Sequence, residues 1–206
     1  WDAVDYQKTS AEQQRWGLEL LDRIALSGNE HVLDIGCGDG KLTAEIARRV
    51  PSGSVLGVDK SKDMICFSRE HYGINAFPNL AFRLLDARDL PFDQDFDVVF
   101  SNAALHWIDD HANILLRIRK SLLVGGRVIA QMGGKGNAAA ILKILGTIMS
   151  SEKWAKYFND FSIPYTFYDA QEYRPLLESA GFTVKRIEII PKLMEHRGKE
   201  GLASWI

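Results

Sequence analysis

The sequence of 206 residues has few cysteines, no long apolar run and little net charge, and each absence excludes a class of protein. Cys37 and Cys66 are the only cysteines. A disulfide framework is therefore not expected, and a reducing compartment, the cytoplasm, is predicted. No apolar run approaches the ~20 residues that span a bilayer, and no signal peptide is visible. The chain begins at Trp1 instead of a methionine, as a trimmed piece of a longer protein would.

The charge balance argues against polyanionic partners. The formal net charge is -2, so neither nucleic acid nor an anionic membrane surface is expected as a partner. A basic cluster near the end is interpreted as a solvated face; it comprises Lys192, His196, Arg197 and Lys199. No group of His, Cys and Asp residues has metal-ligand spacing, so no metal is predicted.

Short apolar runs alternate with amphipathic segments along most of the chain. Strands are predicted at 31–35, 55–59, 80–85, 96–101, 127–132 and 182–190, and helices at 11–26, 41–50, 61–72, 109–123, 138–149 and 170–180. Ser10 and Ser61 are the expected N-caps of two helices, and Gly125-Gly126 is expected to close a third. This alternation predicts an α/β fold with a doubly wound, mostly parallel sheet, whose ligand lies at the carboxyl ends of the strands.

The segment that follows the first strand has alternating glycines after an acid. Asp34 precedes Gly36, Gly38 and Gly40, and helical residues follow. Glycines let a ligand approach the main chain at a helix N-terminus. A dinucleotide site has the longer G-x-G-x-x-G spacing, and an acid before the turn would repel a phosphate. The acid suits the cationic methionine end of S-adenosylmethionine, so a methyltransferase is favoured over a nicotinamide dehydrogenase.

Further polar residues at strand ends complete the predicted cofactor site. Asp59 ends the second strand, where an acid accepts both ribose hydroxyls of an adenosine. Met64 can flank the adenine, Asp86 can accept its amino group, and Asn102 should lie near the methionine moiety. The full set of predicted cofactor contacts is Asp34, Gly36, Gly38, Gly40, Asp59, Lys60, Met64, Asp86, Ala87 and Asn102.

These motifs together resemble the class I S-adenosylmethionine-dependent methyltransferases over roughly residues 30 to 132. The resemblance rests on Asp34–Gly40, Gly57-Val58-Asp59-x-Ser61-x-x-Met64, Asp86 and Leu123-x-Gly125-Gly126. Residues 101–111 and Gln131-Met132 look like trans-aconitate methyltransferase and the malonyl-carrier-protein methyltransferase of biotin synthesis. Tyr6-x-Lys8-x-Ser10-x-x-Gln13 and the Trp154-x-x-Tyr157 region are similar to insect juvenile-hormone-acid methyltransferase.

All three of these families methylate carboxylates, which implies a small carboxylic acid as acceptor. In the resemblance, Gln13 and Trp107 correspond to residues that contact the acceptor carboxylate, and His106 fills a position where relatives vary. An ionised acid needs no general base, whereas a hydroxyl acceptor would need one, for which His106 is the nearest candidate. A second interpretation makes His106 a packed histidine beside Trp107. C- or N-methylation of another small metabolite, and a non-catalytic relative that binds the cofactor, are the rival functions.

Four regions follow from these motifs. Residues 1–29 are expected to form an arm and helix over the active site, 30–132 the cofactor-binding core, 133–180 an aromatic-rich lid, and 181–206 a C-terminal strand and tail. The aromatic residues of 154–168 are interpreted either as core or as the wall of an acceptor pocket. The resemblance also implies a further C-terminal strand in relatives, so the last strand of the sheet is expected to be absent here.

Overall fold

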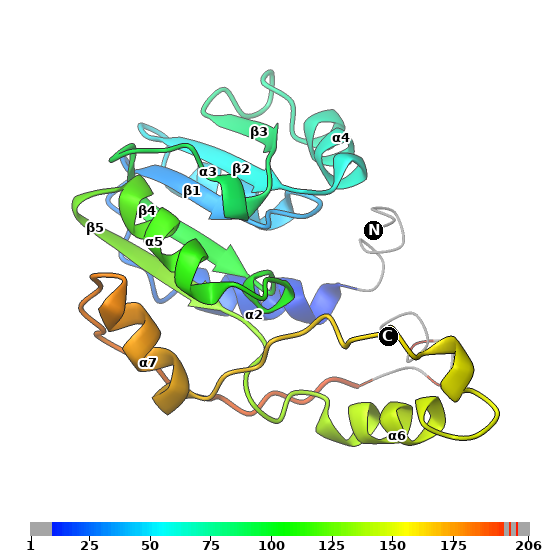
Figure 1. Cartoon of the computed structure of the whole chain (residues 1–206). Coiled ribbons are helices and arrows are strands. Elements are labelled where there is room, and N and C mark those ends of the chain that lie inside the picture. The colour runs from blue at the N-terminus through cyan, green and yellow to red at the C-terminus, as the bar shows by residue number, and fades with distance from the viewer. Residues whose placement is uncertain (1–9, 196–197, 199–200, 202–206) are drawn as a thin grey trace.

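The chain folds around one parallel β-sheet of five strands (Figure 1). The computed structural model describes residues 10–195, 198 and 201, so the arm predicted before Ser10 and three residues of the basic cluster (His196, Arg197 and Lys199) lie outside the described residues. The strands are β1 (His31–Ile35), β2 (Ser54–Asp59), β3 (Leu80–Leu84), β4 (Phe96–Asn102) and β5 (Leu122–Gln131). Their order is β3-β2-β1-β4-β5 and all neighbours are parallel. The predicted doubly wound α/β sheet is confirmed.

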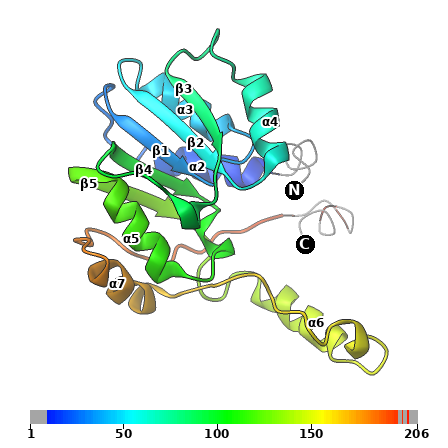
Figure 2. The same ribbon diagram turned by 45° about the horizontal axis from the view of Figure 1, so that its top comes forward.

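Helices cover both faces of this sheet (Figures 1 and 2). These helices are α2 (Ala11–Leu21), α3 (Lys41–Arg49), α4 (Lys62–His71), α5 (His111–Ser121) and α7 (Ala170–Ser179). A further helix, α6 (Ala139–Met149), lies outside these layers, and η1 (Ala87–Asp89), η2 (Leu105–Trp107) and η3 (Ala155–Tyr157) are short 3-10 turns. One apolar cluster joins the sheet to α2, α3 and α4, and a second joins it to α5 and α7. Burial on both faces explains why the central strands β1 and β4 are largely apolar.

Parallel pairing brings the carboxyl ends of the strands to one edge of the sheet. β1 pairs with β2 on one side and β4 on the other, with Ile35 opposite Val58. The glycine turn after β1, the end of β2 at Asp59 and the end of β4 at Asn102 are therefore neighbours. This edge is where a doubly wound sheet binds its ligand.

Several predicted helix ends and caps differ from the structure. α2 ends at Leu21, five residues before the predicted end. Ser10 is the N-cap residue of α2 as predicted, but its side chain makes no capping bond; its hydroxyl accepts a hydrogen bond from Lys41 Nζ at 2.5 Å instead. Gly125-Gly126 does not close α5, because β5 begins at Leu122 and its pairing with β4 is irregular at that point. By contrast, the Ser61 cap of α4 is confirmed, since its hydroxyl accepts from Met64 N–H at 3.4 Å.

The prediction of a strand at 182–190 is wrong, because no strand forms between α7 and residue 195. In this part of the chain the residues contact α2 and the turn after it instead. Arg23 and Glu188 form an ion pair of 3.8 Å, and Lys192 pairs with Glu19 and lies over the Trp16 ring. A strand requires a hydrogen-bonded neighbour, and the described residues place none beyond β5.

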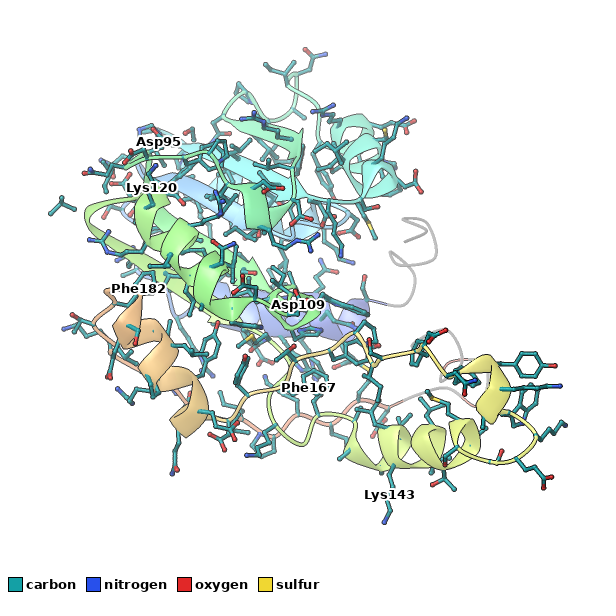
Figure 3. The ribbon with its side chains drawn as sticks, viewed as in Figure 1. Asp95, Asp109, Lys120, Lys143, Phe167 and Phe182 are labelled. Atoms are coloured by element: carbon teal, nitrogen blue, oxygen red, sulfur yellow. The ribbon has the colours of Figure 1, made fainter. Side chains whose placement is uncertain are left out.

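Helix α6 extends away from the sheet layers together with η3 (Figure 2). It is strongly apolar, yet none of its residues is buried. Lys143 projects outward from it, whereas Phe167 lies back toward the sheet (Figure 3). Within the described part of the chain, no helix is long and apolar enough to cross a membrane.

Candidate cofactor and acceptor site

A pocket of about 930 Å³, partly open to solvent, lies at the carboxyl ends of β1, β2 and β4. The structure brings nine of the predicted site residues together in its wall: Gly36, Gly38, Asp59, Lys60, Met64, Asp86, Ala87, Asn102 and Trp107. They come from β2, β4, α4, η1, η2 and the glycine turn, so the pocket depends on the sheet order described above.

A second, smaller pocket of about 360 Å³ shares Gly36, Gly38 and Asn102 with the first. It contains Asp34 and Gln13, which comes from α2. Gln13 and Trp107, predicted to contact the same acceptor group, therefore line two adjoining pockets.

The glycine turn makes room for a ligand and for close packing. Gly36 and Gly38 have φ of 71° and 54°, values that favour glycine. A Cβ on Gly36 would lie 2.2 Å from the Ala104 Cβ. Gly40 lines neither pocket; it precedes α3 with φ 83°, and a Cβ there would lie 2.8 Å from Phe82. Gly40 is thus placed to let α3 pack, whereas Gly36 and Gly38 form the wall of the cradle.

The Asp59 carboxylate is fixed at the end of β2 by two backbone donors. One oxygen accepts from Gly38 N–H at 3.0 Å and the other from Ser61 N–H at 2.8 Å. A carboxylate has about four acceptor positions, so each oxygen retains capacity for a ligand hydroxyl. This arrangement joins β2 to the glycine turn and fits the two hydroxyls of a ribose.

The Asp34 carboxyl lies beneath the same turn and is buried. One of its oxygens accepts from Thr43 Oγ1 at 2.7 Å. Burial is the main cause that raises the pKa of Asp34 to about 7; the Thr43 hydrogen bond opposes this rise and the negative charge of Asp59 adds to it. A positive charge in the small pocket would favour the ionised form. The two carboxyl groups therefore fit a ligand that carries a cation.

Asp86 is paired with a residue that was not predicted from the sequence. The Arg88 guanidinium donates to both Asp86 oxygens, at 3.0 and 2.7 Å, and the Arg88 backbone N–H donates at 2.9 Å. These hydrogen bonds lower the pKa of Asp86, which stays ionised at neutral pH. Arg88 also lines the large pocket. The Asp-x-Arg sequence at the start of η1 was the available signal for this pair.

His106 lines neither pocket. Its Nδ1 accepts from Gly133 N–H at 3.2 Å, and the rings of Trp107, Tyr165 and Phe167 lie around it with centroids 5.6–6.2 Å away. Burial lowers the pKa of His106 to about 4, with a smaller effect of charge on His111. The ring is therefore neutral at pH 7 and packed against aromatic neighbours.

The aromatic segment 154–168 divides between two environments. Tyr165 contacts Trp107 edge to face at 4.6 Å and stacks on Phe167 at 5.4 Å, and Thr166 N–H donates to the His106 carbonyl at 2.9 Å. At the far end, Tyr157 is 67% exposed and contacts Trp154. One half of the segment thus packs over η2 next to the pocket, and the other half lies with α6.

Comparisons with known proteins agree with this geometry. The family described as "Methyltransferase domain" matches residues 26–181. An uncharacterized methyltransferase of Schizosaccharomyces pombe is 36% identical over 211 residues, which cover 100% of this chain and 80% of the relative. A trans-aconitate 2-methyltransferase of Mycolicibacterium gilvum is 31% identical over 208 residues, covering 100% of this chain and 78% of the relative.

Solved structures show the same fold. A phosphoethanolamine N-methyltransferase of Haemonchus contortus, solved with phosphomonomethylethanolamine and S-adenosylhomocysteine, superposes with a TM-score of 0.68 at 23% sequence identity. The match covers 87% of this chain and 41% of that chain. At this identity the likeness concerns the fold alone.

Proposed function

The chain belongs to the class I S-adenosylmethionine-dependent methyltransferases, with S-adenosylmethionine as its cofactor, and from this premise we propose that it methylates an oxygen of a small carboxylic acid. When bound, the cofactor supplies a methyl group on a positively charged sulfur. Asp59 would bind the ribose, Asp86 and Met64 the adenine, and Asp34 the charge of the methionine end. These residues would align the methyl group with the acceptor, which is the main contribution a protein makes to such a displacement.

One observation carries the choice of a carboxylate: the candidate general base, His106, is packed outside both pockets. It accepts a hydrogen bond from Gly133 N–H and has its pKa lowered to about 4 by burial, so its ring is withdrawn from the acceptor. A carboxylic acid is ionised at pH 7 and attacks without a base, whereas a hydroxyl would need one. The relatives named trans-aconitate 2-methyltransferase support the same acceptor chemistry.

The two predicted acceptor contacts suit an anion that lies where the pockets join. The Trp107 indole N–H only donates hydrogen bonds, and the Gln13 amide can present its NH₂ group. Gln13 Oε1 is buried and has no hydrogen-bond partner among the described residues; to bind an anion, the amide would direct its NH₂ group, not this oxygen, at the ligand. In the proposal, the acceptor carboxylate lies near Asn102, between Trp107 on one side and Gln13 on the other.

A screen with labelled cofactor tests this proposal. The wild-type chain is incubated with methyl-labelled S-adenosylmethionine and a set of small acids, each paired with the alcohol and the amine of the same skeleton. We expect label in base-labile methyl esters of one or more acids and none in the alcohols or amines. Label in an amine or at a carbon would replace the proposal by N- or C-methylation.

Variants of the residues predicted to contact the acceptor provide a second test of the proposal. Trp107→Phe and Gln13→Ala should each lower turnover of the acid, while His106→Ala should change it little. A loss of roughly 10²–10⁴-fold confined to His106→Ala, as when a general base is removed, would contradict the carboxylate.

A further inference from the structure

Asn102 lines both pockets, and its side-chain amide is held by hydrogen bonds on two sides. Its Nδ2 donates to the backbone carbonyl of Gln13 at 3.1 Å, and its Oδ1 accepts from Gln131 Nε2 at 3.1 Å. Gln131 ends β5 and lines neither pocket. The bonds thus connect α2, β4 and β5 at the wall that the pockets share.

The direction of these hydrogen bonds is fixed by a backbone group. The Gln13 carbonyl can only accept, so the Asn102 amide must present its NH₂ to it. The Asn102 oxygen then faces Gln131, which must donate with its own NH₂. The opposite orientation of either amide would place two acceptors, or two donors, against each other. Only one arrangement satisfies all three groups.

Close packing of α2 holds this arrangement in place. Gly17 lies inside α2, where glycine is less favourable than alanine. A Cβ at Gly17 would lie 2.3 Å from Leu42 Cδ1 and 3.1 Å from Asn102 Nδ2. The missing side chain lets α2 approach the amide. On the other side of Asn102, Ala103 has φ of 56° and its N–H donates to the Gln131 carbonyl at 2.8 Å.

We propose that Gln131 is a positioning residue that, together with the Gln13 carbonyl, keeps the Asn102 amide turned as a hydrogen-bond donor toward a carboxylate bound where the two pockets meet. The Asn102 NH₂ has two hydrogens and the Gln13 carbonyl takes one, which leaves the other for the ligand. Two ligands of this enzyme carry such a group: the amino-acid end of the cofactor and, under the proposed function, the acid acceptor. The proposal for Gln131 stands on the cofactor pocket and holds for either source.

Two substitutions of similar size distinguish positioning from packing. In Gln131→Met the donor is lost, but the Gln13 carbonyl still orients Asn102, so S-adenosylhomocysteine affinity should fall only about 2- to 10-fold. In Gln131→Glu an ionised carboxylate can only accept; it would draw the Asn102 NH₂ toward itself and turn Oδ1 toward the Gln13 carbonyl. Affinity at neutral pH should then fall about 10- to 100-fold, although glutamate matches the shape of glutamine better than methionine does.

The pH dependence gives a readout that a packing role would not move. Once protonated, the carboxyl introduced by Gln131→Glu can donate like the native amide. The affinity of this variant relative to wild type should therefore recover as the pH is lowered toward the range in which glutamate takes up a proton. Isothermal titration of S-adenosylhomocysteine measures this without any acceptor. Gln171→Glu, the same change on the exposed face of α7, is the matched control and should follow wild type at every pH.

The same variants show whether the bound carboxylate belongs to the cofactor or to the acceptor. If the group belongs to the cofactor, the variants weaken S-adenosylhomocysteine binding; if it belongs to the acceptor, binding is unchanged and the KM for the acid rises with kcat nearly constant. If Gln131→Glu fails to fold, Gln131→Met is measured both in the wild-type protein and in the Asn102→Leu variant. The effect of Gln131→Met on affinity should vanish in the Asn102→Leu variant. Equal effects in both backgrounds, or Gln131→Glu behaving like wild type at neutral pH in both assays, would overturn the proposal.

Discussion

Two carboxyl groups at the glycine turn differ in environment although they lie on adjacent strands. Asp59 is fixed by two backbone N–H groups at the end of β2, whereas Asp34 is buried and has its pKa raised to about 7. The first presents acceptor positions in a fixed direction. The second changes protonation near neutral pH, so its interaction with a cation depends on pH.

The role of Asp59 is tested by removing its carboxylate. We expect Asp59→Ala to weaken S-adenosylhomocysteine binding by about 1.5–3 kcal/mol, since it removes charge-assisted hydrogen bonds to the ribose. Asp59→Asn keeps one oxygen acceptor and should lie between Asp59→Ala and wild type. Calorimetric titration gives the affinities, and circular dichroism checks the fold. Unchanged binding by a folded Asp59→Ala protein would exclude the ribose contact.

The raised pKa of Asp34 predicts a pH-dependent affinity. A cationic ligand favours the ionised carboxylate, so below about pH 7 binding must first release the proton from Asp34. Affinity should therefore fall as the pH decreases below 7, by at most about tenfold per pH unit. Titrations of S-adenosylmethionine between pH 8 and pH 5, about the range around this pKa, measure the slope. Asp34→Asn should bind more weakly but with that slope removed; a slope that persists would assign it to another group.

At the scale of elements, the strands were predictable and their connections were less so. β1 was predicted with its observed ends and the starts of the others within a few residues, except for β5, because an apolar run bounded by turn residues is a local pattern. The irregular start of β5 at Leu122 depends on pairing with β4, which no local pattern encodes. The apolar pattern at 182–190 suited a strand, yet without a neighbouring strand those residues contact α2 and the turn after it instead.

The candidate site was likewise predictable where it depends on local sequence patterns, and not where it depends on packing between elements. Residues at the strand ends were predicted because the topology places all carboxyl ends at one edge. The separation of Gln13 and Trp107 into two pockets was not predicted, since the position of α2 depends on its close approach at Gly17, where a Cβ would meet Leu42 and Asn102. Gln131 was noted only as part of a resemblance; its hydrogen bond to Asn102 crosses from β5 to β4 and leaves no signature in spacing.

The apolar side chains of helix α6 are not buried, so we expect them to contribute little to the free energy of unfolding. Ile144 is 61% exposed on α6, whereas Ile114 is 0% exposed on α5. Ile114→Ala should lower the free energy of unfolding by about 2–5 kcal/mol, and Ile144→Ala by less than about 1 kcal/mol. Urea unfolding of both variants measures the difference. A large loss at Ile144 would mean that α6 is covered in solution.

At the scale of the whole molecule, the cofactor pocket joins parts of the chain that are far apart in sequence. Its wall extends from Ile35 to Ile108 and includes β2, α4, η1 and β4. Each of these elements also packs into one of the two apolar clusters on the faces of the sheet. A ligand in the pocket therefore contacts the native sheet as a unit and has no comparable site on the unfolded chain.

Ligand binding should accordingly raise the thermal stability of the whole chain, and only for the right ligand. A ligand at 100 times its Kd stabilises the native state by about 2.7 kcal/mol, which for a domain of this size shifts Tm by about 5–10 °C. We expect this shift with S-adenosylhomocysteine and none with NAD, whose pyrophosphate would face the carboxyl group of Asp34. Differential scanning calorimetry of wild type and of Asp59→Ala checks it, the variant requiring more S-adenosylhomocysteine for the same shift. Stabilisation by NAD but not by S-adenosylhomocysteine would reverse the assignment of the glycine turn, because the fold alone accommodates either nucleotide.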